Sequence, residues 1–336
     1  MEEKFVRFSG FDILKFLCAF LVVCIHCPFP GIVGQYFTAL ARIAVPIFFM
    51  ITGFFYLDIV NKHRQGQQIK KIFIYFALAN FFYLVWKLLL AVVSGTGISA
   101  WFVQTFSVKN IINFIVFNES PFNGHLWYLG ALLYVLLIMV VVYRSRLNKI
   151  FCAITPLLLL GDLIFGKYSL FVLHREFPYI VVRNFFFVGL PYFCIGMMLR
   201  KYKGIVKTKT FLLLSILFSL TTLLERYLLV SADLNATRDQ YISTTLLSIT
   251  VFMFFREFYQ KRSLSKVEQV FAKVGREYSV WVYIIHPVFI TILSVLMGKC
   301  GLYNAYQFIA PIIVYFVSIV FVSVMCIIIK KIKQAV

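Results

Sequence analysis

The stretch GFDILKFLCAFLVVCIHC, residues 10–27, is long and apolar enough to cross a bilayer as a helix. It nevertheless carries Asp12, Lys15 and His26, three ionisable side chains that are costly inside a membrane. It does not resemble a cleaved signal sequence, because Asp12 and Lys15 lie within it and no small-residue cleavage pattern follows. We therefore predict that this stretch remains in the mature protein as its first membrane helix.

The composition of the whole chain is that of a membrane protein. Of the 336 residues, 62% are hydrophobic and 14% are charged, whereas a soluble globular chain is about half apolar and about a quarter charged. This excludes a water-soluble fold of this size, a disulfide-rich secreted module and a disordered chain. The 39 Phe and 19 Tyr residues suit surfaces that face lipid and the membrane interface. We predict an all-α integral membrane protein.

Ten stretches match the length and polarity of a membrane helix, which needs about 20 largely apolar residues. They cover residues 10–27, 38–58, 72–94, 124–143, 150–165, 181–199, 210–231, 240–257, 278–297 and 308–329. We predict a bundle of about ten transmembrane helices that forms a single domain over residues 1–336, with no appended soluble domain. The intervening residues 95–123 are expected to lie along the outer membrane interface or to dip into it.

The positions of the basic residues predict the orientation of the chain. Most of the 33 Lys and Arg residues fall on one side of the predicted helices, and that side includes both chain ends. Because cytoplasmic loops carry an excess of Lys and Arg, we predict that both termini are cytoplasmic, in a multi-pass protein of the plasma (inner) membrane. The net charge of +20 is spread over short clusters that suit the lipid bilayer, so no nucleic-acid partner is expected.

The three ionisable residues of the first stretch form a polar stripe. At 100° per residue, Lys15 and His26 lie within about 20° of a common helix face and about 16 Å apart along the axis. Asp12 lies one turn from Lys15, and on spacing alone we assign it to orienting that lysine. Each residue has an ordinary interpretation, in which Asp12 pairs with Lys15 and His26 is merely interfacial. Three such residues on one face favour a site.

Further polar residues collect towards the predicted outer ends of other helices and are candidates for a substrate pocket. For Glu225 a structural pairing with another helix is the stronger alternative, and for Arg42 and His125 an interfacial position is about equally plausible. His286 lies about 12 Å into its stretch, on one face with Ser279 and Tyr283. No spacing of Cys, His or carboxylates resembles a metal site, so no metal is expected. The candidates are Arg42, His125, Arg183, Glu225 and His286.

These residue types predict a general base and an anion-holding cation. A histidine at the mouth of a polar pocket can take a proton from a hydroxyl group. A lysine deeper on the same helix face can hold an anionic group that arrives from the other side. The placement of His26 and Lys15 therefore favours two substrates, one entering from each side of the membrane.

The order of several motifs resembles that of the integral-membrane acyltransferase-3 family. Residues 11–15, ten intervening residues and His26 are similar to its opening-helix pattern of a basic residue, ten residues and a histidine. Lys15 stands where arginine is usual in that family. The chain looks most similar to surface-polysaccharide O-acyltransferases and to the membrane portion of vancomycin-resistance serine racemases. Other segments that resemble the family are residues 45–55, 127–129, 183–196 and 278–286.

The resemblance implies transfer of an acyl group, usually acetyl from acetyl-CoA, to a hydroxyl of a cell-surface glycan or lipid-linked sugar outside a bacterial membrane. By matching position, His26 would be the base and Lys15 the donor-side cation. Arg64, Lys70 and Lys71 could hold the phosphates of coenzyme A, or act only as orientation charges. Arg42, His125, Glu225 and His286 would be pocket residues. The sequence gives no indication of oligomeric state.

One alternative comes from a different class of function. The same polar stripe could line a path for a small amino acid such as serine, as suggested for the racemase-linked relatives. Transporters favour broken helices with Gly or Pro in matched halves, for which Pro46, Pro191 and Pro287 give weak support. Because the chain ends after its tenth predicted helix, we expect it to carry no racemase domain.

Overall fold

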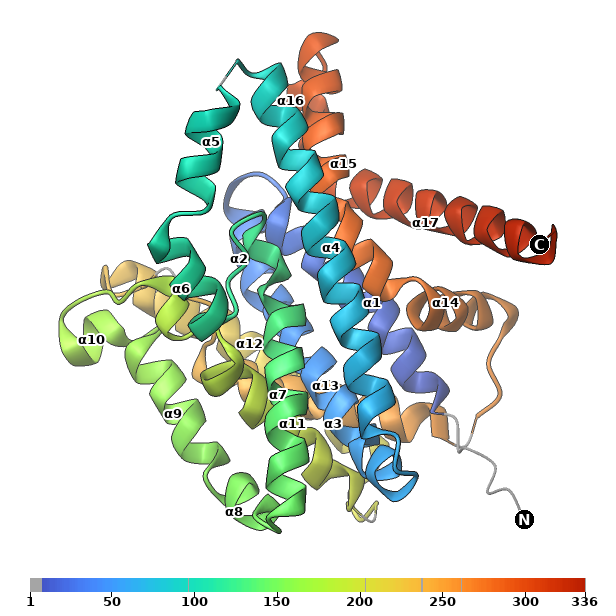
Figure 1. Ribbon diagram of the computed structural model, residues 1–336. Helices are drawn as coiled ribbons and strands as arrows, with labels where there is room; N and C mark the ends of the chain where they lie inside the picture. The colour runs from blue at the N-terminus through green and yellow to red at the C-terminus, as the bar shows by residue number, and fades with distance from the viewer. Residues whose placement is uncertain (1–7, 96, 203, 237, 261, 336) are drawn as a thin grey trace. The chain divides into compact units, whose positions relative to one another are not determined.

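The computed structural model describes residues 8–335 apart from residues 96, 203, 237 and 261 (Figure 1). Every regular element in this part of the chain is a helix, which confirms the predicted all-α class. The chain divides into two compact units. The first comprises Met1–Phe48, Lys203–Ser231 and Tyr241–Val336, and the second comprises Phe49–Tyr202 and Ala232–Gln240. Their boundary falls within a continuous helix, α3 (Ala44–Asn61).

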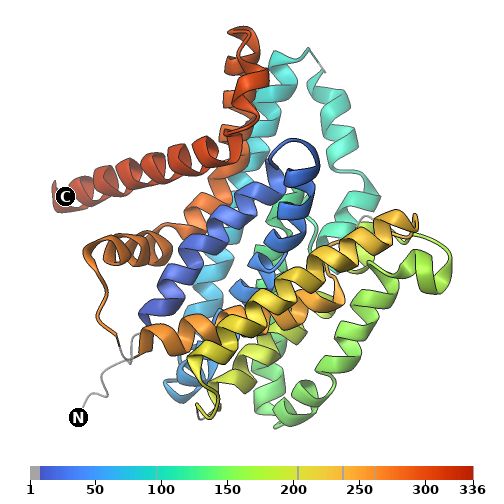
Figure 2. The ribbon, with the colours of Figure 1, turned by 180° about the vertical axis from the view of Figure 1, so that it is seen from behind.

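The first unit is built around the N-terminal helix, α1. Helices α2, α13, α14, α15 and α17 all pack against it, and α12 lies alongside α13, as Figure 2 shows. The helices of this unit are α1 (Ser9–His26), α2 (Gly31–Ala41), the start of α3, α12 (Thr208–Ser231), α13 (Ile242–Gln260), α14 (Lys266–Glu277), α15 (Ser279–Lys299), α16 (Tyr303–Tyr306) and α17 (Ala310–Ala335).

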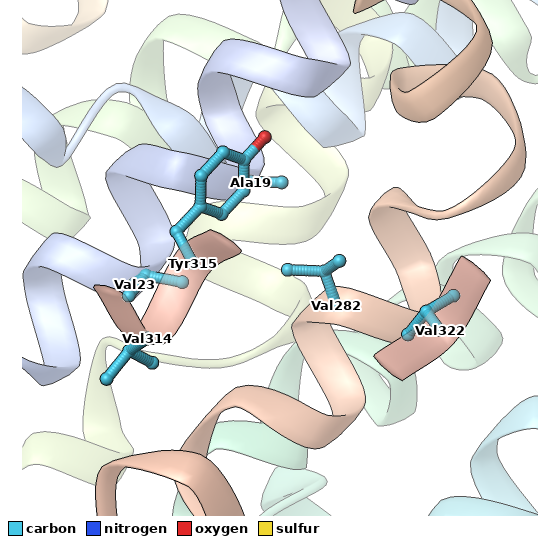
Figure 3. Packing of buried hydrophobic residues seen from close by; sticks show 6 residues of the cluster. All are labelled: Ala19, Val23, Val282, Val314, Tyr315 and Val322. Atoms are coloured by element: carbon cyan, nitrogen blue, oxygen red, sulfur yellow. The ribbon is translucent and has the colours of Figure 1, made fainter. Parts of the chain in front are cut away.

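Small and β-branched side chains join α1, α15 and α17 in the core of the first unit. The buried cluster in Figure 3 consists of Ala19, Val23, Val282, Val314, Tyr315 and Val322. Tyr315 also donates its hydroxyl to the carbonyl of Phe16, 2.7 Å away, so the one polar atom among these side chains is satisfied. This packing holds the C-terminal half of α1 against α15, which positions the site described below.

The second unit begins with the rest of α3 and continues through α11. Its other elements are α4 (Gln65–Val93), α5 (Ile98–Thr105), α6 (Val108–Phe117), η1 (Gly124–Leu126), α7 (Trp127–Arg144), α8 (Asn148–Ala153), α9 (Thr155–Phe165), α10 (Ser169–Leu173), η2 (Tyr179–Val181), η3 (Phe185–Gly189) and α11 (Leu190–Arg200). Helices α4 and α7 pack together. A Cβ on Gly53 would lie 2.0 Å from the carbonyl oxygen of Phe193, so α3 and α11 are in backbone contact.

Seven helical segments of the described chain are long and apolar enough to cross a membrane. An eighth is possible if α5 and α6, which meet at a 44° bend, count as one broken span or re-entrant loop. The seven are Ser9–His26, Gly31–Asn61, Gln65–Val93, Gly124–Arg144, Thr208–Ser231, Ser279–Lys299 and Ala310–Ile332. The bend falls within residues 95–123, which we expected to lie at or in the outer interface.

The predicted count of ten spans is not confirmed. Residues 150–165 are divided between the short helices α8 and α9, and residues 181–199 are divided among η2, η3 and α11. Helix α13, which covers most of residues 240–257, carries several Ser and Thr residues and an Arg–Glu pair near its end, so its apolar character is weaker. The stretch 38–58 lies within the Gly31–Asn61 segment, although α2 ends at Ala41 and α3 begins at Ala44.

Candidate functional site

Two histidines meet where α1 ends. His26 is the last residue of α1 and is exposed, whereas His286 lies in the middle of α15 with a fully buried side chain. The centroids of their rings are 5.3 Å apart. The packing of α1 on α15 therefore brings together two residues that are 260 positions apart in the sequence and were predicted separately.

The orientation of the His286 ring follows from its local sequence. Pro287 has no N–H, so the helical carbonyl four residues earlier, that of Tyr283, loses its usual donor. The His286 ring lies beside the carbonyls of Val282 and Tyr283, with Nδ1 3.1 Å from the oxygen of Val282. Because a carbonyl only accepts hydrogen bonds, Nδ1 must be the protonated nitrogen. The neutral ring then presents Nε2 as an acceptor.

His26 lines a cavity of about 620 Å³ within the first unit. The α1–α2 loop, α2, α12 and the α15–α16 region supply its walls. Six of the lining residues that can form hydrogen bonds with a bound molecule are His26, Gln35, Thr38, Arg226, Ser294 and Tyr306. The cavity combines hydrogen-bonding groups with the aromatic rings of Phe29, Tyr303 and Tyr306, a mixture that suits a polar organic molecule with hydroxyl groups.

Tyr306 is the most enclosed polar residue of this cavity. Its side chain is 4% exposed, and its hydroxyl has no hydrogen-bond partner among the described residues. Burial raises the pKa of Tyr306 to about 12, with smaller contributions from Cys27 and Tyr303. The hydroxyl therefore stays protonated at neutral pH and can donate a hydrogen bond to a bound molecule.

Arg226 brings a positive charge to the cavity wall. Its Nη2 donates to Oε1 of Gln35 at 2.6 Å, and its guanidinium lies over the Tyr36 ring, 5.3 Å from the centroid. The buried Tyr241 interacts with Arg226 and also electrostatically with Arg42. The predicted pocket residue Arg42 thus belongs to the same unit as this wall. The sequence did not make Arg226 a pocket residue, because Glu225 and Arg226 point apart on their helix and each was expected to pair with another helix.

Glu225 is engaged at the start of α13. Its two carboxylate oxygens accept the backbone N–H groups of Ile242 at 3.1 Å and Ser243 at 3.0 Å, and the Ser243 hydroxyl also donates to it. The first N–H groups of a helix have no partner within the helix, and a negative charge suits its N-terminus. Glu225 therefore ties α12 to α13, a structural pairing that the sequence also allowed.

Asp12 and Lys15 form the ion pair that their spacing suggested, with Nζ 3.6 Å from Oδ1. Asp12 has a second cationic neighbour, because Nη1 of Arg276 in α14 lies 3.8 Å from Oδ2. The sequence did not indicate this contact. Helices α1 and α14 approach closely enough to form it because residue 275 is glycine, where a Cβ would lie 1.9 Å from the carbonyl oxygen of Asp12.

His125 and Arg183 belong to the second unit, where both lie near Trp127. His125 is buried in η1, and its ring contacts that of Tyr83 at a centroid distance of 5.0 Å. Arg183 lies over the rings of Tyr179 and Trp127 and has Nη2 3.6 Å from Oε1 of Glu119. The structure thus places both predicted residues in the second unit, with Arg183 over the tryptophan that follows His125 by two positions.

The second unit also contains charged residues that the sequence did not single out. Lys167 is buried and donates to the carbonyl of Ala236 at 2.8 Å. Tyr179 donates its hydroxyl to Asp239. These contacts attach the 232–240 segment to the rest of the unit. Lys167 lies between two predicted helices, where no periodic pattern of apolar residues indicates which side chains are buried.

The predicted phosphate-binding residues Arg64, Lys70 and Lys71 lie in the second unit and are exposed. Arg64 precedes α4, and the two lysines lie in its first turns. Lys71 is 5.7 Å from the centroid of the Tyr75 ring. Within the described residues, no group of three His, Cys, Asp or Glu side chains is arranged to hold a metal ion.

Comparison with known families gives the site a context. The acyltransferase-3 family model, described as an acyltransferase domain, matches residues 8–329. The chain belongs to this family. The match agrees with the resemblance of the motifs around Lys15 and His26 to the opening helix of that family. Together with the apolar helices, this match identifies the chain as a multi-pass membrane protein of the acyltransferase-3 family.

This acyltransferase-3 chain is also similar to curated enterococcal proteins. A serine/alanine racemase of Enterococcus gallinarum is 26% identical over 306 residues, which cover 83% of this chain and 40% of that protein. An amino-acid racemase of Enterococcus faecalis is 24% identical over 311 residues, which cover 85% of this chain and 42% of that protein. Another amino-acid racemase from that organism is 34% identical over 131 residues, which cover 37% of this chain and 17% of that protein. The chain thus spans less than half the length of these relatives. No solved structure matches it.

Proposed function

We propose that this acyltransferase moves an acetyl group from cytoplasmic acetyl-CoA to a hydroxyl of an extracytoplasmic cell-surface carbohydrate. The observation that carries the proposal is the exposed His26 ring, adjacent to the buried His286 and open to a cavity lined with polar and aromatic groups. A histidine in that position is suited to general-base work on a sugar hydroxyl.

The reaction balances with one histidine as the proton carrier. His26 takes the proton of the acceptor hydroxyl, and the oxygen attacks the carbonyl carbon of the thioester. The tetrahedral intermediate collapses with cleavage of the C–S bond, and the proton on His26 passes to the departing coenzyme A thiolate. Arg226 and Tyr306 supply donors on the cavity wall that can hold the acceptor or the developing negative charge.

The donor would enter from the opposite end of α1. Lys15 lies about 16 Å from His26 along the helix axis, so it is too distant to touch the same reacting carbonyl. It is better placed to act on the donor, either by neutralising a phosphate or by hydrogen bonding to the pantetheine arm. Asp12 orients Lys15 through their 3.6 Å contact, and Arg276 supports Asp12 from α14.

The proposed arrangement includes the orientation of the chain in the plasma membrane of a bacterium. With ten crossings and both termini cytoplasmic, Lys15 would lie towards the cytoplasm and His26 at the external side. The cytoplasm supplies acetyl-CoA, and the external face carries the glycan or lipid-linked sugar. The enterococcal origin of the relatives supports a bacterial host.

The test compares cells that express wild-type protein with cells that express His26→Ala. Acetate bound as an alkali-labile ester on cell-surface polysaccharide is quantified after mild base treatment. We expect wild-type cells to carry more ester-linked acetate than vector controls. The His26→Ala protein should insert normally and transfer roughly 10²–10⁴-fold more slowly, as expected for loss of a general base. Equal ester content in wild-type and vector cells would refute the proposal.

A second candidate function is the transport of a small amino acid such as serine. It is favoured by the names of the relatives, which are a serine/alanine racemase and amino-acid racemases. Proteoliposomes that contain the purified protein provide the test, with radiolabelled L-serine as the probe. Saturable uptake of serine without any transfer of acetyl groups would favour this candidate over the acyltransferase.

A further inference from the structure

A second cavity of the first unit lies beside α14, at the N-terminal end of α1. It has a volume of about 640 Å³. We call it the α14 cavity and define it by its lining residues Ser9, Lys266, Gln269, Val270, Lys273 and Arg276, together with Leu264. Three of these side chains are cationic and none is acidic. Such a lining suits an anionic ligand that carries more than one negative charge.

Helix α14 is held firmly enough to present a defined surface. It begins with a capping box, in which the Ser265 hydroxyl accepts the N–H of Glu268 at 3.3 Å and Glu268 accepts the N–H of Ser265 at 2.8 Å. Its inner face packs on α1, where the rings of Phe271 and Phe16 stack at a centroid distance of 4.5 Å. Gly275 completes that contact against the Asp12 backbone.

The outer face of α14 carries the two lysines of the cavity. Lys266 and Lys273 are seven residues apart, which places them within about 20° of one helix face and about 10 Å apart along the axis. Both are exposed. That spacing allows two separate phosphate groups of one ligand to be contacted at once. The neighbouring Val267 and Val270 are also exposed and give this face an apolar strip.

The positive charge of this face is not neutralised within the described part of the protein. No carboxylate there lies within salt-bridge distance of Lys266 or Lys273. The acidic residues nearest in sequence are engaged elsewhere. Glu268 is engaged by the capping box and by Arg262, and Glu277 is paired with Arg276. The two lysines could serve merely as orientation charges, but that role needs no cavity and no fixed helix.

We propose that the α14 cavity binds the phosphates of the acyl donor, with Lys266 and Lys273 holding the phosphorylated nucleotide end of coenzyme A. This rests on the proposed function, which makes acyl-CoA the donor. Coenzyme A carries a diphosphate and a separate 3′-phosphate, a pattern that matches two cations about 10 Å apart. The cavity includes Ser9 at the start of α1, so the pantetheine arm would run along α1 from Lys15 towards His26.

The experiment measures binding rather than turnover. Calorimetric titration of purified protein with coenzyme A and with 3′-dephospho-coenzyme A gives two dissociation constants. We expect the double variant Lys266→Gln/Lys273→Gln to bind coenzyme A about tenfold more weakly than wild type. The preference of wild type for coenzyme A over its dephospho form should shrink in that variant, because the two changes remove the same contact. Binding should also weaken as salt rises.

Two variants control for a general loss of charge or of folding. Lys207→Gln/Lys209→Gln removes the same charge from the same unit and should bind coenzyme A like wild type. Lys266→Arg/Lys273→Arg keeps the charge and should restore binding. An unchanged affinity in Lys266→Gln/Lys273→Gln would overturn the cavity assignment while leaving the proposed function intact. Normal binding through these lysines without acetyl transfer would instead refute the proposed function and leave the cavity assignment standing.

Anionic lipid head groups carry the same phosphate chemistry and form the other arm of the test. The titrations are repeated in nanodiscs of phosphatidylcholine alone and with phosphatidylglycerol added. If the cavity holds coenzyme A, the affinity of wild type should be little changed by the anionic lipid. Two results together would show that the donor assignment is wrong and that the ligand is lipid. Phosphatidylglycerol would weaken coenzyme A binding in wild type but not in Lys266→Gln/Lys273→Gln. The variant would also bind coenzyme A as tightly as wild type in phosphatidylcholine.

Discussion

Glu225 in α12 accepts the backbone N–H of Ser243 in α13 at 3.0 Å, and the side-chain hydroxyl of the same serine donates to it as well. Two helices that are adjacent in sequence are therefore joined by a carboxylate at the N-terminus of the second. This contact accounts for a charged residue that the sequence also made a candidate for substrate binding. The two roles make different predictions.

If Glu225 acts as the cap of α13, Glu225→Ala should lower the stability of the protein by about 1–2 kcal/mol, because the first N–H groups of α13 lose their acceptor. The midpoint of thermal unfolding in detergent measures this change. Glu225→Gln keeps an acceptor oxygen and should be less damaging. A Glu225→Ala protein with unchanged stability and a raised KM for the acceptor would show that the residue binds substrate instead.

His286 is expected to act through His26 as a positioning residue. His286→Gln should lower kcat with little change in KM for acetyl-CoA, because the proposed donor contacts lie at the other end of α1 whereas the His26 ring loses its neighbour at 5.3 Å. Tyr283→Phe, on the same buried face of α15, is the matched control and should keep the wild-type kcat.

Lys15 is expected to affect the donor and not the acceptor. Lys15→Met should raise KM for acetyl-CoA several-fold, while Lys15→Arg should keep activity because it retains the charge. Asp12 keeps its contact with Arg276 in both variants, so neither leaves a buried carboxylate without a cation. Donor and acceptor titrations of the two variants provide the measurement. Unchanged donor dependence in Lys15→Met would mean that the lysine serves only Asp12.

The start of α14 should resist acid. The backbone N–H of Ser265, followed by the Ser265 hydroxyl and Arg262, lowers the pKa of Glu268 to about 2. Because the folded-state pKa is below the ordinary value near 4.5, this stabilisation is complete above about pH 4.5 and is lost as the pH falls towards 2. The hydrogen-exchange rates of the α14 amides should therefore differ between wild type and Glu268→Gln at neutral pH, and they should become equal only near pH 2. A difference that persists unchanged at pH 2 would contradict this assignment.

The proposed orientation predicts which residues an impermeant thiol reagent can reach from outside intact cells. In a cysteine-free background, single cysteines at Arg64, Arg146 and Arg262 should remain unlabelled. Those at Gly31, Lys109 and Asn235 should react, because they lie on the side with few basic residues. Permeabilised cells show that every site can react. External labelling at Arg146 would exclude an arrangement with ten crossings and both termini inside.

Local patterns in the sequence predicted the polar contacts that lie within one helix. The i,i+3 spacing of Asp12 and Lys15 indicated an ion pair, and the structure contains it. The contact between His26 and His286 depends on how α1 packs against α15, and no local pattern carries that information. The same holds for Arg276 beside Asp12 and for Arg226 beside Gln35, each of which joins residues more than 190 positions apart.

Helix breaks were also difficult to foresee. The apolar run 38–58 was predicted as one membrane helix and lies within the Gly31–Asn61 segment, yet α2 ends at Ala41 and α3 begins at Ala44. Apolar runs report that a segment is buried or faces lipid, but they do not report where the backbone turns. Residues 181–199 show the same effect, because Asn184 accepts the N–H groups of Phe186 and Phe187 and starts a new helical segment inside the run.

The close approach at Gly275 has a consequence for how this gene can vary. Its α-carbon lies where any side chain would meet the Asp12 carbonyl, and that contact fixes the register of α14 on α1. Every single-base change that replaces a glycine codon by another amino acid introduces a Cβ. Every missense substitution at position 275 therefore disturbs the contact between α14 and α1. Among functional variants recovered after random mutagenesis, substitutions of Gly275 should be rarer than substitutions of Gly298, where a Cβ would meet open space.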